Sequence, residues 1–367
     1  MLRTSKALAL AAAVITTSPI LAPALAQTPK SGTLVKFATT NAMIWNAVAV
    51  DGSRVFVAGP RWAGGTGPQL AIVTSAGRVT PYPDAGWNNW QAGKDPAKAF
   101  VNINAIHLDR AGGLWVVDTG SPQFGGDPLP AGAKLVRIVL ATNKVDRVIP
   151  LGAELALPGS YIDDIRFNGD HAYLTDAGKP GLLVLDLASG HARRVLDGHP
   201  AAIAREGRPI VVAGDTVRAP DGTPLKVNSD PLEVSADGKW LHFGPLEGPW
   251  SKISTALLDD PTVSAEDLSR AVEPWIDLPP VGGTALAPDG SLYFADLASS
   301  SVKRRHPDGQ IETLISDPVL HWVDAPFLAD DGRLWLPVPQ MDRAPLFHGG
   351  RSAVRWPIAL YYLETRK

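Results

Sequence analysis

The sequence contains no cysteine among its 367 residues. Disulfide bridges, thiolate metal sites and cysteine nucleophiles are therefore excluded together. The composition is otherwise that of a folded protein, with 45% hydrophobic and 19% charged residues, and it lacks the high net charge and low hydrophobicity of disordered chains. The fold must therefore be held together by burial of apolar side chains and by pairing of strands.

Long apolar runs are also scarce. One run, residues 7–15, follows two basic residues and precedes the small residues 24–26, a pattern typical of a cleaved export signal. We predict that residues 1–26 are a signal peptide and that the protein is exported to the periplasm or the extracellular space. A membrane anchor is the alternative, but the polar residues and proline of 16–19 end the run before about 20 apolar residues are reached. No later run is long enough to span a membrane.

Basic runs are absent as well. The net charge is −3 and becomes −5 when the signal, whose only charged residues are Arg3 and Lys6, is removed. A mildly acidic exported protein of this kind is not expected to bind nucleic acid. The sequence also lacks a GxSxG nucleophile elbow, an HExxH motif, a phosphate-binding glycine loop and a dinucleotide fingerprint. Hydride transfer, phosphoryl transfer and a nucleotide cofactor are therefore not expected.

A repeated hairpin organises the chain. In residues 104–120, two short apolar runs flank Asp109-Arg-Ala-Gly-Gly113, which supplies the residues of a tight turn and so predicts a β-hairpin. Similar hairpins recur at roughly 40- to 70-residue intervals, as expected for a repeat architecture with insertions. The six copies lie at 47–60, 105–120, 164–178, 232–246, 284–298 and 326–339.

Most intervals contain a second hairpin, at 70–82, 134–151, 181–196 and 301–315. Four strands in each of six units predict an all-β fold, a six-bladed β-propeller with four-stranded antiparallel blades. In the fourth unit the outer strands are expected around 253–258 and 275–278. A β-sandwich is the alternative, but its signals recur every 8–12 residues or so.

The two ends of the mature chain complete this pattern. The strand-like segments Leu34 to Phe37 and Ala359 to Leu363 are predicted to pair in one blade and close the ring, which removes exposed strand edges. We therefore expect residues 33–367 to form one propeller domain and the protein to be a monomer.

Segments spread over nearly all of the mature chain resemble the yellow / major royal jelly protein family, of which this chain would be a bacterial-type member. Matching segments include GGLWVVDTG (112–120), YLTDAGKPGLLVLDL (173–187) and SADGKWLHFGPLEG (235–248). The specific parts are LWVVDTG and FGPLEG. The resemblance implies a secreted six-bladed propeller. It implies no single reaction, because the family includes proteins linked to pigment chemistry, dopachrome isomerisation, binding of biogenic amines and nutrition. Insect members usually carry disulfides, which this chain cannot form.

The starts of the six innermost strands are expected to face the mouth of a central channel. The six positions are Asn46, Asn104, Asp164, Asp230, Gly283/Thr284 and Asp324. At five of them, all except Gly283/Thr284, the residue is Asn or Asp, whose side chain carries oxygen. The pattern resembles the gluconolactonase / senescence-marker-protein group, whose channel metal is held by Glu, Asn and Asp. That resemblance implies Asn104, Asp164 and Asp230 as metal ligands, with Asn46 in place of the Glu.

Carboxylate and amide oxygens suit a hard divalent cation, Ca²⁺ first, with Mg²⁺, Mn²⁺ or Zn²⁺ as alternatives. A bound cation would polarise a lactone carbonyl and lower the pKa of a water, with Asp164 or Asp230 as general base. The alternative is that these side chains cap strand ends or bind water in the channel.

Aromatic residues are placed near the same mouth. Trp45, His321 and Trp322, with Asn46 and Asp324, are predicted to contact a ring-shaped or cationic ligand by stacking. His107 is expected to be packed or solvent-facing instead. Asp118, Asp176 and Asp296 recur at the end of the second strand, which favours a structural role in turns.

Three hypotheses about function follow. The first is an exported propeller that binds a small organic molecule at the channel mouth, and the second is a metal-dependent lactone hydrolase. The third is a protein-binding propeller without chemistry, which would use loops such as 84–99 and 245–275. If the protein is an enzyme, a lactonase or an isomerase of the yellow type is expected.

Overall fold

The computed structural model describes residues 32–365. The predicted signal peptide, residues 1–26, lies outside this range. None of the helices in residues 32–365 is long and apolar enough to cross a membrane.

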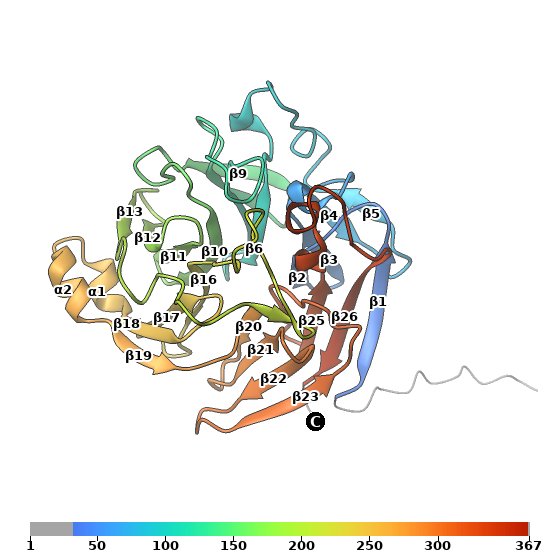
Figure 1. Cartoon of the computed structure of the whole chain (residues 1–367). Helices are drawn as coiled ribbons and strands as arrows, with labels where there is room; N and C mark the ends of the chain where they lie inside the picture. The colour runs from blue at the N-terminus through green and yellow to red at the C-terminus, as the bar shows by residue number, and fades with distance from the viewer. Residues whose placement is uncertain (1–31, 366–367) are drawn as a thin grey trace, which may run out of the picture.

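Six four-stranded antiparallel sheets surround a central axis as the blades of a propeller (Figure 1). Five blades follow the chain from the innermost to the outermost strand. Blade 1 is β2 (Ala47–Asp51), β3 (Arg54–Ala58), β4 (Leu70–Val73) and β5 (Val79–Pro81); blade 2 is β6 (Ile103–Leu108), β7 (Gly113–Asp118), β8 (Lys134–Val139) and β9 (Lys144–Pro150). Blade 3 is β10 (Ile162–Asn168), β11 (His171–Asp176), β12 (Gly181–Asp186) and β13 (Ala192–Val195). The six-bladed propeller predicted from the repeats is confirmed.

The remaining blades complete the ring. Blade 4 is β16 (Ser229–Val234), β17 (Trp240–Pro245), β18 (Trp250–Ser254) and β19 (Glu273–Ile276); blade 5 is β20 (Val281–Leu286), β21 (Leu292–Asp296), β22 (Ser301–Arg305) and β23 (Ile311–Ser316). Blade 6 is β24 (Phe327–Leu328), β25 (Arg333–Val338), β26 (Ile358–Glu364) and, outermost, β1 (Leu34–Thr40). β1 pairs with β26 from Leu34↔Leu363 to Thr40↔Ile358, so the predicted closure by the two ends of the chain is confirmed.

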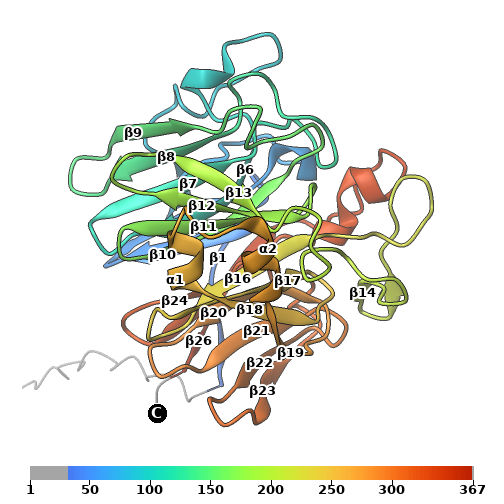
Figure 2. The same ribbon diagram turned by 90° about the vertical axis from the view of Figure 1, so that its left-hand side faces the viewer.

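The outer half of blade 4 differs from the prediction. The third strand ends at Ser254, and the next residues form α1 (Thr255–Asp259) instead of continuing the strand to 258. Leu258 on this short helix is fully buried, so the apolar run that resembles a strand is buried by a helix instead. α1 and α2 (Ala265–Arg270) connect β18 to β19 along the chain and lie on the outer side of the ring (Figure 1 and Figure 2).

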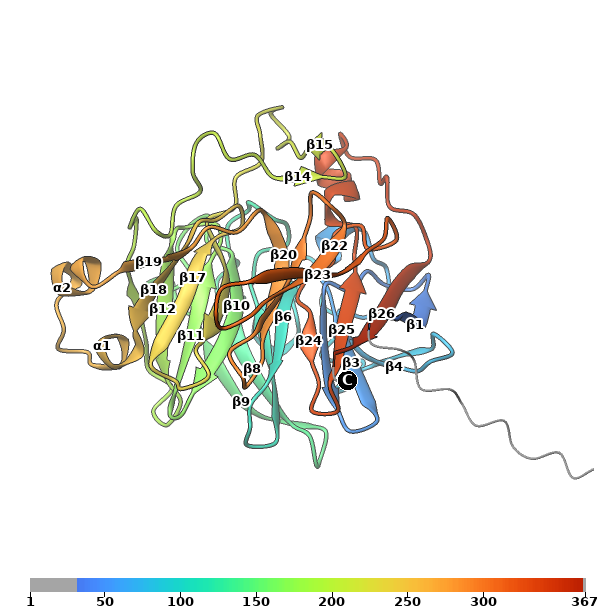
Figure 3. The same ribbon diagram turned by 90° about the horizontal axis from the view of Figure 1, so that it is seen from below.

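One face of the propeller carries the longer connections, and we call it the mouth face. The innermost strands begin there, because the connections between blades and those between second and third strands lie on the same side of antiparallel blades. Within the described residues, four short 3-10 helices lie in connections on this face: η1 (Arg61–Ala63), η2 (Pro96–Lys98), η3 (Met341–Arg343) and η4 (Pro345–Phe347). A small hairpin, β14 (Val211–Val212) and β15 (Asp215–Thr216), lies there too. Figure 3 shows this hairpin and the segment between β25 and β26 rising from one face of the ring.

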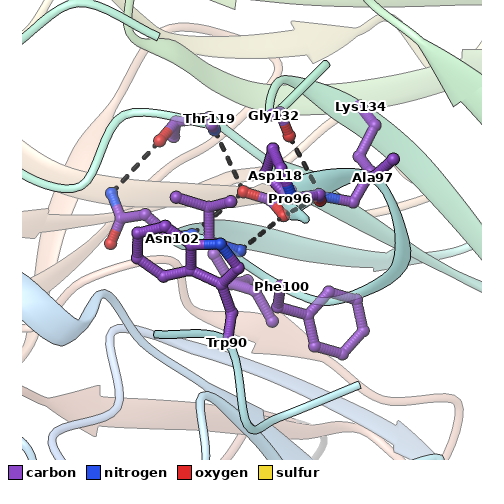
Figure 4. Close-up of polar contacts among 12 residues, drawn as sticks. Trp90, Pro96, Ala97, Phe100, Asn102, Asp118, Thr119, Gly132 and Lys134 are labelled. Atoms are coloured by element: carbon purple, nitrogen blue, oxygen red, sulfur yellow. Dashed lines mark hydrogen bonds and ion pairs between the residues drawn. The ribbon is translucent and has the colours of Figure 1, made fainter. Parts of the chain in front are cut away.

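The recurrent aspartates at the ends of second strands are structural. Asp118 is fully buried and accepts hydrogen bonds from the backbone N–H groups of Val101 (2.9 Å) and Asn102 (3.0 Å). It also forms an ion pair of 2.6 Å with Lys134, which reaches it from β8 (Figure 4). Asp176 and Asp296 likewise accept backbone N–H groups from the following turn and pair with Arg194 and Lys303. These contacts explain why an aspartate recurs at the end of the second strand in three blades: it stabilises the turn there.

Candidate functional site

A small cavity of about 20 Å³ lies where the six innermost strands begin, and every blade contributes to its wall. This volume is close to the space that one water molecule or one small ion needs. Five predicted site residues line it, namely Asn46, Asn104, Asp164, Asp230 and Asp324. Asp163, which was not predicted, lines it too, and the remaining wall is formed by Ala105, Pro231, Gly282, Gly283, Thr284 and Ala325.

The inner strands are irregular at these residues. The register with the second strand shifts between 103 and 105, between 162 and 165, between 229 and 232, and between 281 and 284. A bulge of this kind places successive residues on the same side of a strand, which the regular alternation of a strand forbids. This is how Asp163 and Asp164 both reach the cavity. The Asp-Pro pair at 230–231 and the Gly-Gly pair at 282–283 are sequence signals for such bulges.

Asp163 is held by a chain of hydrogen bonds from the mouth face. Trp62 Nε1 donates to Tyr161 Oη at 2.9 Å, and Tyr161 Oη donates to Asn104 Oδ1 at 3.0 Å. Asn104 Nδ2 then donates to Asp163 Oδ1 at 2.7 Å. The chain directs the amide nitrogen of Asn104 toward Asp163 and its oxygen toward Tyr161.

Asp164 has a different partner. Arg166 NH1 donates to its Oδ2 at 2.6 Å, and the same guanidinium binds Glu233 through Nε and NH2 at 3.1 Å each. Thr284 Oγ1 donates to Glu233 Oε1 at 2.8 Å. Burial opposes the charge on Arg166, but Asp164 and Glu233 outweigh burial and raise its pKa. Arg166 is therefore fully engaged by two carboxylates.

Within residues 32–365, the other three carboxyl groups of the cavity have no cationic partner. Burial raises the pKa of Asp163 well above its usual value, and Asp230, Asp164 and Asp324 raise it further. Burial, followed by Asp324 and Asp164, does the same for Asp230. Burial raises the pKa of Asp324 to about 7, although hydrogen bonds from Ala325 N–H and Trp322 lower it. Crowded carboxylates of this kind favour binding of a proton or of a cation.

Asn46 contributes a polar atom without a partner. Its Nδ2 donates to the carbonyl oxygen of Asn104 at 2.9 Å, whereas its buried Oδ1 has no hydrogen-bond partner in the structure. An unsatisfied buried oxygen costs free energy. A donor or a cation at this end of the cavity would remove that cost.

The predicted aromatic residues lie in three different surroundings. Trp45 has no exposed surface and donates from Nε1 to the carbonyl oxygen of Ala359 at 3.0 Å, so it packs between blades and not in the cavity. Trp322 is buried beside the site, with Nε1 3.3 Å from Asp324 Oδ2. His321 does not line the cavity, and its Nε2 lies 2.8 Å from Asp342 Oδ2. The cavity therefore has no ring of exposed tryptophans.

His107 is packed as expected. Its ring stacks on Phe167 at 5.9 Å, and burial, helped by Arg166, lowers its pKa to about 3. It is therefore neutral at physiological pH and lies outside the cavity lining.

The oxygen donors of the cavity do not form a complete metal site in the structure. Among residues 32–365 no three Asp, Glu or His side chains form a group with the geometry of a metal site. Of the predicted trio, Asn104 Oδ1 accepts from Tyr161 and Asp164 is bound by Arg166. The side chain of Asp230 forms no hydrogen bond within the described residues. Asp163, Asp230, Asp324 and the Oδ1 of Asn46 are the donors left for a hard cation.

Solved structures of similar shape include a gluconolactonase from Xanthomonas campestris, with a TM-score of 0.52 and 13% identity over 90% of this chain and 88% of that one. A luciferin-regenerating enzyme has a TM-score of 0.52 and 8% identity over 90% of this chain and 94% of that one. At these identities the likeness shows the fold alone.

Sequence relatives point to one family. The chain is 34% identical over 135 residues to protein yellow of Drosophila pseudoobscura pseudoobscura, covering 33% of this chain and 23% of that protein. For protein yellow of Drosophila melanogaster the identity is 32%, over 33% of this chain and 24% of that protein. The chain thus spans about a quarter of the length of the curated relatives it matches. The model of the major royal jelly protein family matches residues 101–319, more than half of the chain, and the chain therefore belongs to that family.

Proposed function

We propose that this exported propeller binds a small organic cation, whose charged group enters the acidic cavity at the channel mouth. The observation that carries the proposal is the charge of the cavity wall. Four aspartates line the cavity, and the nearest cation, Arg166, is already bound by Asp164 and Glu233. A positive group there would meet three carboxylates that lack a cationic partner and would lower the cost of burying them.

The size of the cavity limits what can enter. A volume of about 20 Å³ admits a charged head group but not an aromatic ring. The body of the ligand would then lie toward the mouth face, where Trp62, Phe124 and Tyr161 form an aromatic group with centroid distances of 5.5 Å (Trp62–Phe124) and 4.9 Å (Phe124–Tyr161). Aromatic faces also attract cations.

Thermal melting with paired compounds tests the proposal. A primary arylalkylamine such as phenethylamine should raise the melting temperature, because a ligand that binds only the folded state stabilises it. Its uncharged alcohol analogue should have no effect. Asp230→Asn should remove the shift, whereas Asp237→Asn, on an exposed turn, is the matched control and should keep it. An equal shift from the alcohol, or no shift from any amine tested, would rule out charge recognition.

A divalent cation is the second candidate occupant, and the unpartnered Oδ1 of Asn46 favours it. Asn46, Asp163 and Asp230 would hold the ion, which would polarise a lactone carbonyl and activate a water. Asp324, whose pKa is raised to about 7 by burial, would accept the proton of that water. Elemental analysis of purified protein, followed by lactone hydrolysis with and without chelator, tests this. Absence of bound metal together with no stabilisation by Ca²⁺, Mg²⁺, Mn²⁺ or Zn²⁺ would remove the candidate.

A further inference from the structure

The connection between blades 3 and 4 crosses the mouth of the channel. It runs from the end of β13 to the start of β16 and contains the β14–β15 hairpin. We call its residues 205–228 the lid segment. In Figure 1 it passes in front of the centre of the ring, and Figure 3 shows its hairpin above the mouth face.

The underside of the lid segment is apolar and buried. Five of its residues are at most 7% exposed, namely Ile210, Val212, Val217, Leu225 and Val227. A two-stranded hairpin cannot bury so many apolar side chains by itself. They belong to one apolar cluster with Tyr161, Ala177, Leu246, Leu297 and Met341, which lie at the mouth ends of blades 3 to 6. The cavity is therefore covered on the mouth face, and a ligand that enters from this face must displace the lid segment.

Each end of the lid segment is anchored by a few hydrogen bonds. At its far end, Asn228 donates from its backbone N–H (3.1 Å) and from Nδ2 (3.2 Å) to the carbonyl oxygen of Ala177. At its near end, Glu247, in the connection between β17 and β18, accepts the backbone N–H of Arg205 at Oε1 (3.0 Å). The backbone carbonyl of Glu247 accepts Arg208 Nε at 2.9 Å. Glu247 thus holds two points of the lid segment.

The carboxyl group of Glu247 is buried, which is unusual for a group that can carry a negative charge. Its residue is 1% exposed and its Oε2 has no hydrogen-bond partner. The charged groups around it are Arg208 and Lys226 of the lid segment and Asp230 of β16. Arg208 is also paired with Asp277 at 2.6 Å and Lys226 with Glu206, so both cations are shared with other carboxylates.

We propose that the lid segment is a pH-dependent gate over the acidic cavity, held closed by Glu247 in its protonated form and loosened when Glu247 ionises. Its use as a gate for a ligand rests on the proposed function, whereas the movement itself does not. Burial raises the pKa of Glu247 to about 7, partly offset by hydrogen bonds and by Arg208 and Lys226. A carboxyl group whose pKa is raised in the closed state stabilises that state at low pH and ceases to do so as pH rises through that value.

Hydrogen–deuterium exchange of the full mature chain measures this movement without any ligand. The backbone amides of Arg205 and Asn228, which donate to Glu247 Oε1 and to the carbonyl oxygen of Ala177, join the lid segment to the blades and report on opening. Rates are divided by the intrinsic rates at each pH to give protection factors. With a pKa of about 7 closed and the usual 4.5 open, protection should fall about tenfold from about pH 6 to about pH 8.

Three variants separate the anchor from its surroundings. Glu247→Gln keeps an oxygen for the Arg205 N–H but cannot ionise, so its protection factors should not fall with pH. Asp215→Asn removes an exposed carboxylate of the same segment and should keep the tenfold fall. Arg208→Ala should lower lid protection at both pH values while global stability, measured by denaturant unfolding, changes less, which keeps the test usable if Glu247→Gln folds poorly.

Three outcomes would overturn the proposal: a fall with pH that persists in Glu247→Gln, no fall in the unaltered protein, or unprotected lid amides at about pH 6. Failure of the cation-binding proposal is read separately. If amines and metals do not stabilise the protein but the exchange results hold, the lid segment moves as proposed and its ligand lies in another chemical class.

Discussion

Asn104 donates its amide hydrogen to Asp163 at 2.7 Å, while the adjacent Asp164 accepts Arg166 at 2.6 Å. Two consecutive aspartates in one inner strand therefore lie in different electrostatic surroundings. Asp164 belongs to an ion-paired network, and Asp163 belongs to a group of carboxylates without a cation. The proposed cation site therefore consists of Asp163, Asp230 and Asp324, and the difference leads to the first prediction.

Asp163→Asn should stabilise the ligand-free protein, because it removes a buried charge that has no counter-ion and keeps an oxygen for Asn104. We expect the free energy of unfolding at about pH 8 to rise by roughly 1 kcal/mol. Asp164→Asn should lower it by about 1–3 kcal/mol, because Arg166 loses one of its two partners. Denaturant unfolding of both variants measures this, and a loss of stability in Asp163→Asn equal to that in Asp164→Asn would contradict the distinction.

The stability of the ligand-free protein should fall between acidic and mildly basic pH. Asp324 has a pKa of about 7 in the folded state against 3.8 normally, because of burial. The folded state therefore binds the proton more tightly, and its contribution is complete at low pH and lost as pH rises through about 7. Asp163 and Asp230 act in the same direction. Asp324→Asn should flatten the dependence of unfolding free energy on pH, and an unchanged slope would show that this carboxyl group is not the source.

Lys134→Met should be among the most damaging single substitutions outside the channel. The ion pair between Lys134 and Asp118 is at most 1% exposed, and removal of one partner leaves a buried charge uncompensated at a cost of about 3–5 kcal/mol. Lys303→Met removes the equivalent cation in blade 5, where Lys303 is 24% exposed, and should cost less. Equal losses in the two variants, measured by denaturant unfolding, would contradict an effect of burial.

Tyr161→Phe should disturb the orientation of Asn104. The hydroxyl group of Tyr161 connects Trp62 Nε1 to Asn104 Oδ1, so its removal leaves the buried Asn104 oxygen and the part-buried Trp62 nitrogen without this partner, at a cost of about 1–3 kcal/mol. Tyr361→Phe is the matched control, because the structure gives the Tyr361 hydroxyl no hydrogen bond and little change in stability is expected. Amine binding should also weaken in Tyr161→Phe, since Asn104 is then free to turn its amide away from Asp163.

The architecture is predictable from the chain because each blade repeats a local signal. A turn of Asp and Gly between two apolar runs marks the inner hairpin of most blades, and the strand-like segments 34–37 and 359–363 are left over to complete the last blade. The end of β18 was predicted too late, since the apolar residues of 255–258 satisfy a strand and a buried helix equally well. Local pattern alone does not distinguish the two.

The location of the site was predictable from the sequence, but the contacts made by its residues were not. Asn46, Asn104, Asp164, Asp230 and Asp324 share one position in the repeat, and all line the cavity. Asp163 was missed because regular alternation assigns it to the opposite face of the strand, and only the bulge of β10 turns it inward. Trp45 was placed at the mouth by its position in the chain, yet packing against blade 6 buries it completely. Contacts between blades, and the covering of the mouth by residues 205–228, depend on tertiary structure that short-range patterns do not encode.

Isothermal titration of the mature protein with phenethylamine and with its uncharged alcohol analogue tests charge recognition in the channel most directly. The amine should bind with one site per chain, the alcohol should give no binding heat, and Asp230→Asn should abolish the amine signal while Asp237→Asn keeps it. Binding should strengthen as pH rises through about 7, as Asp324 loses its proton. Equal binding of amine and alcohol, or amine binding that survives in Asp230→Asn, would contradict a cation site in the acidic cavity.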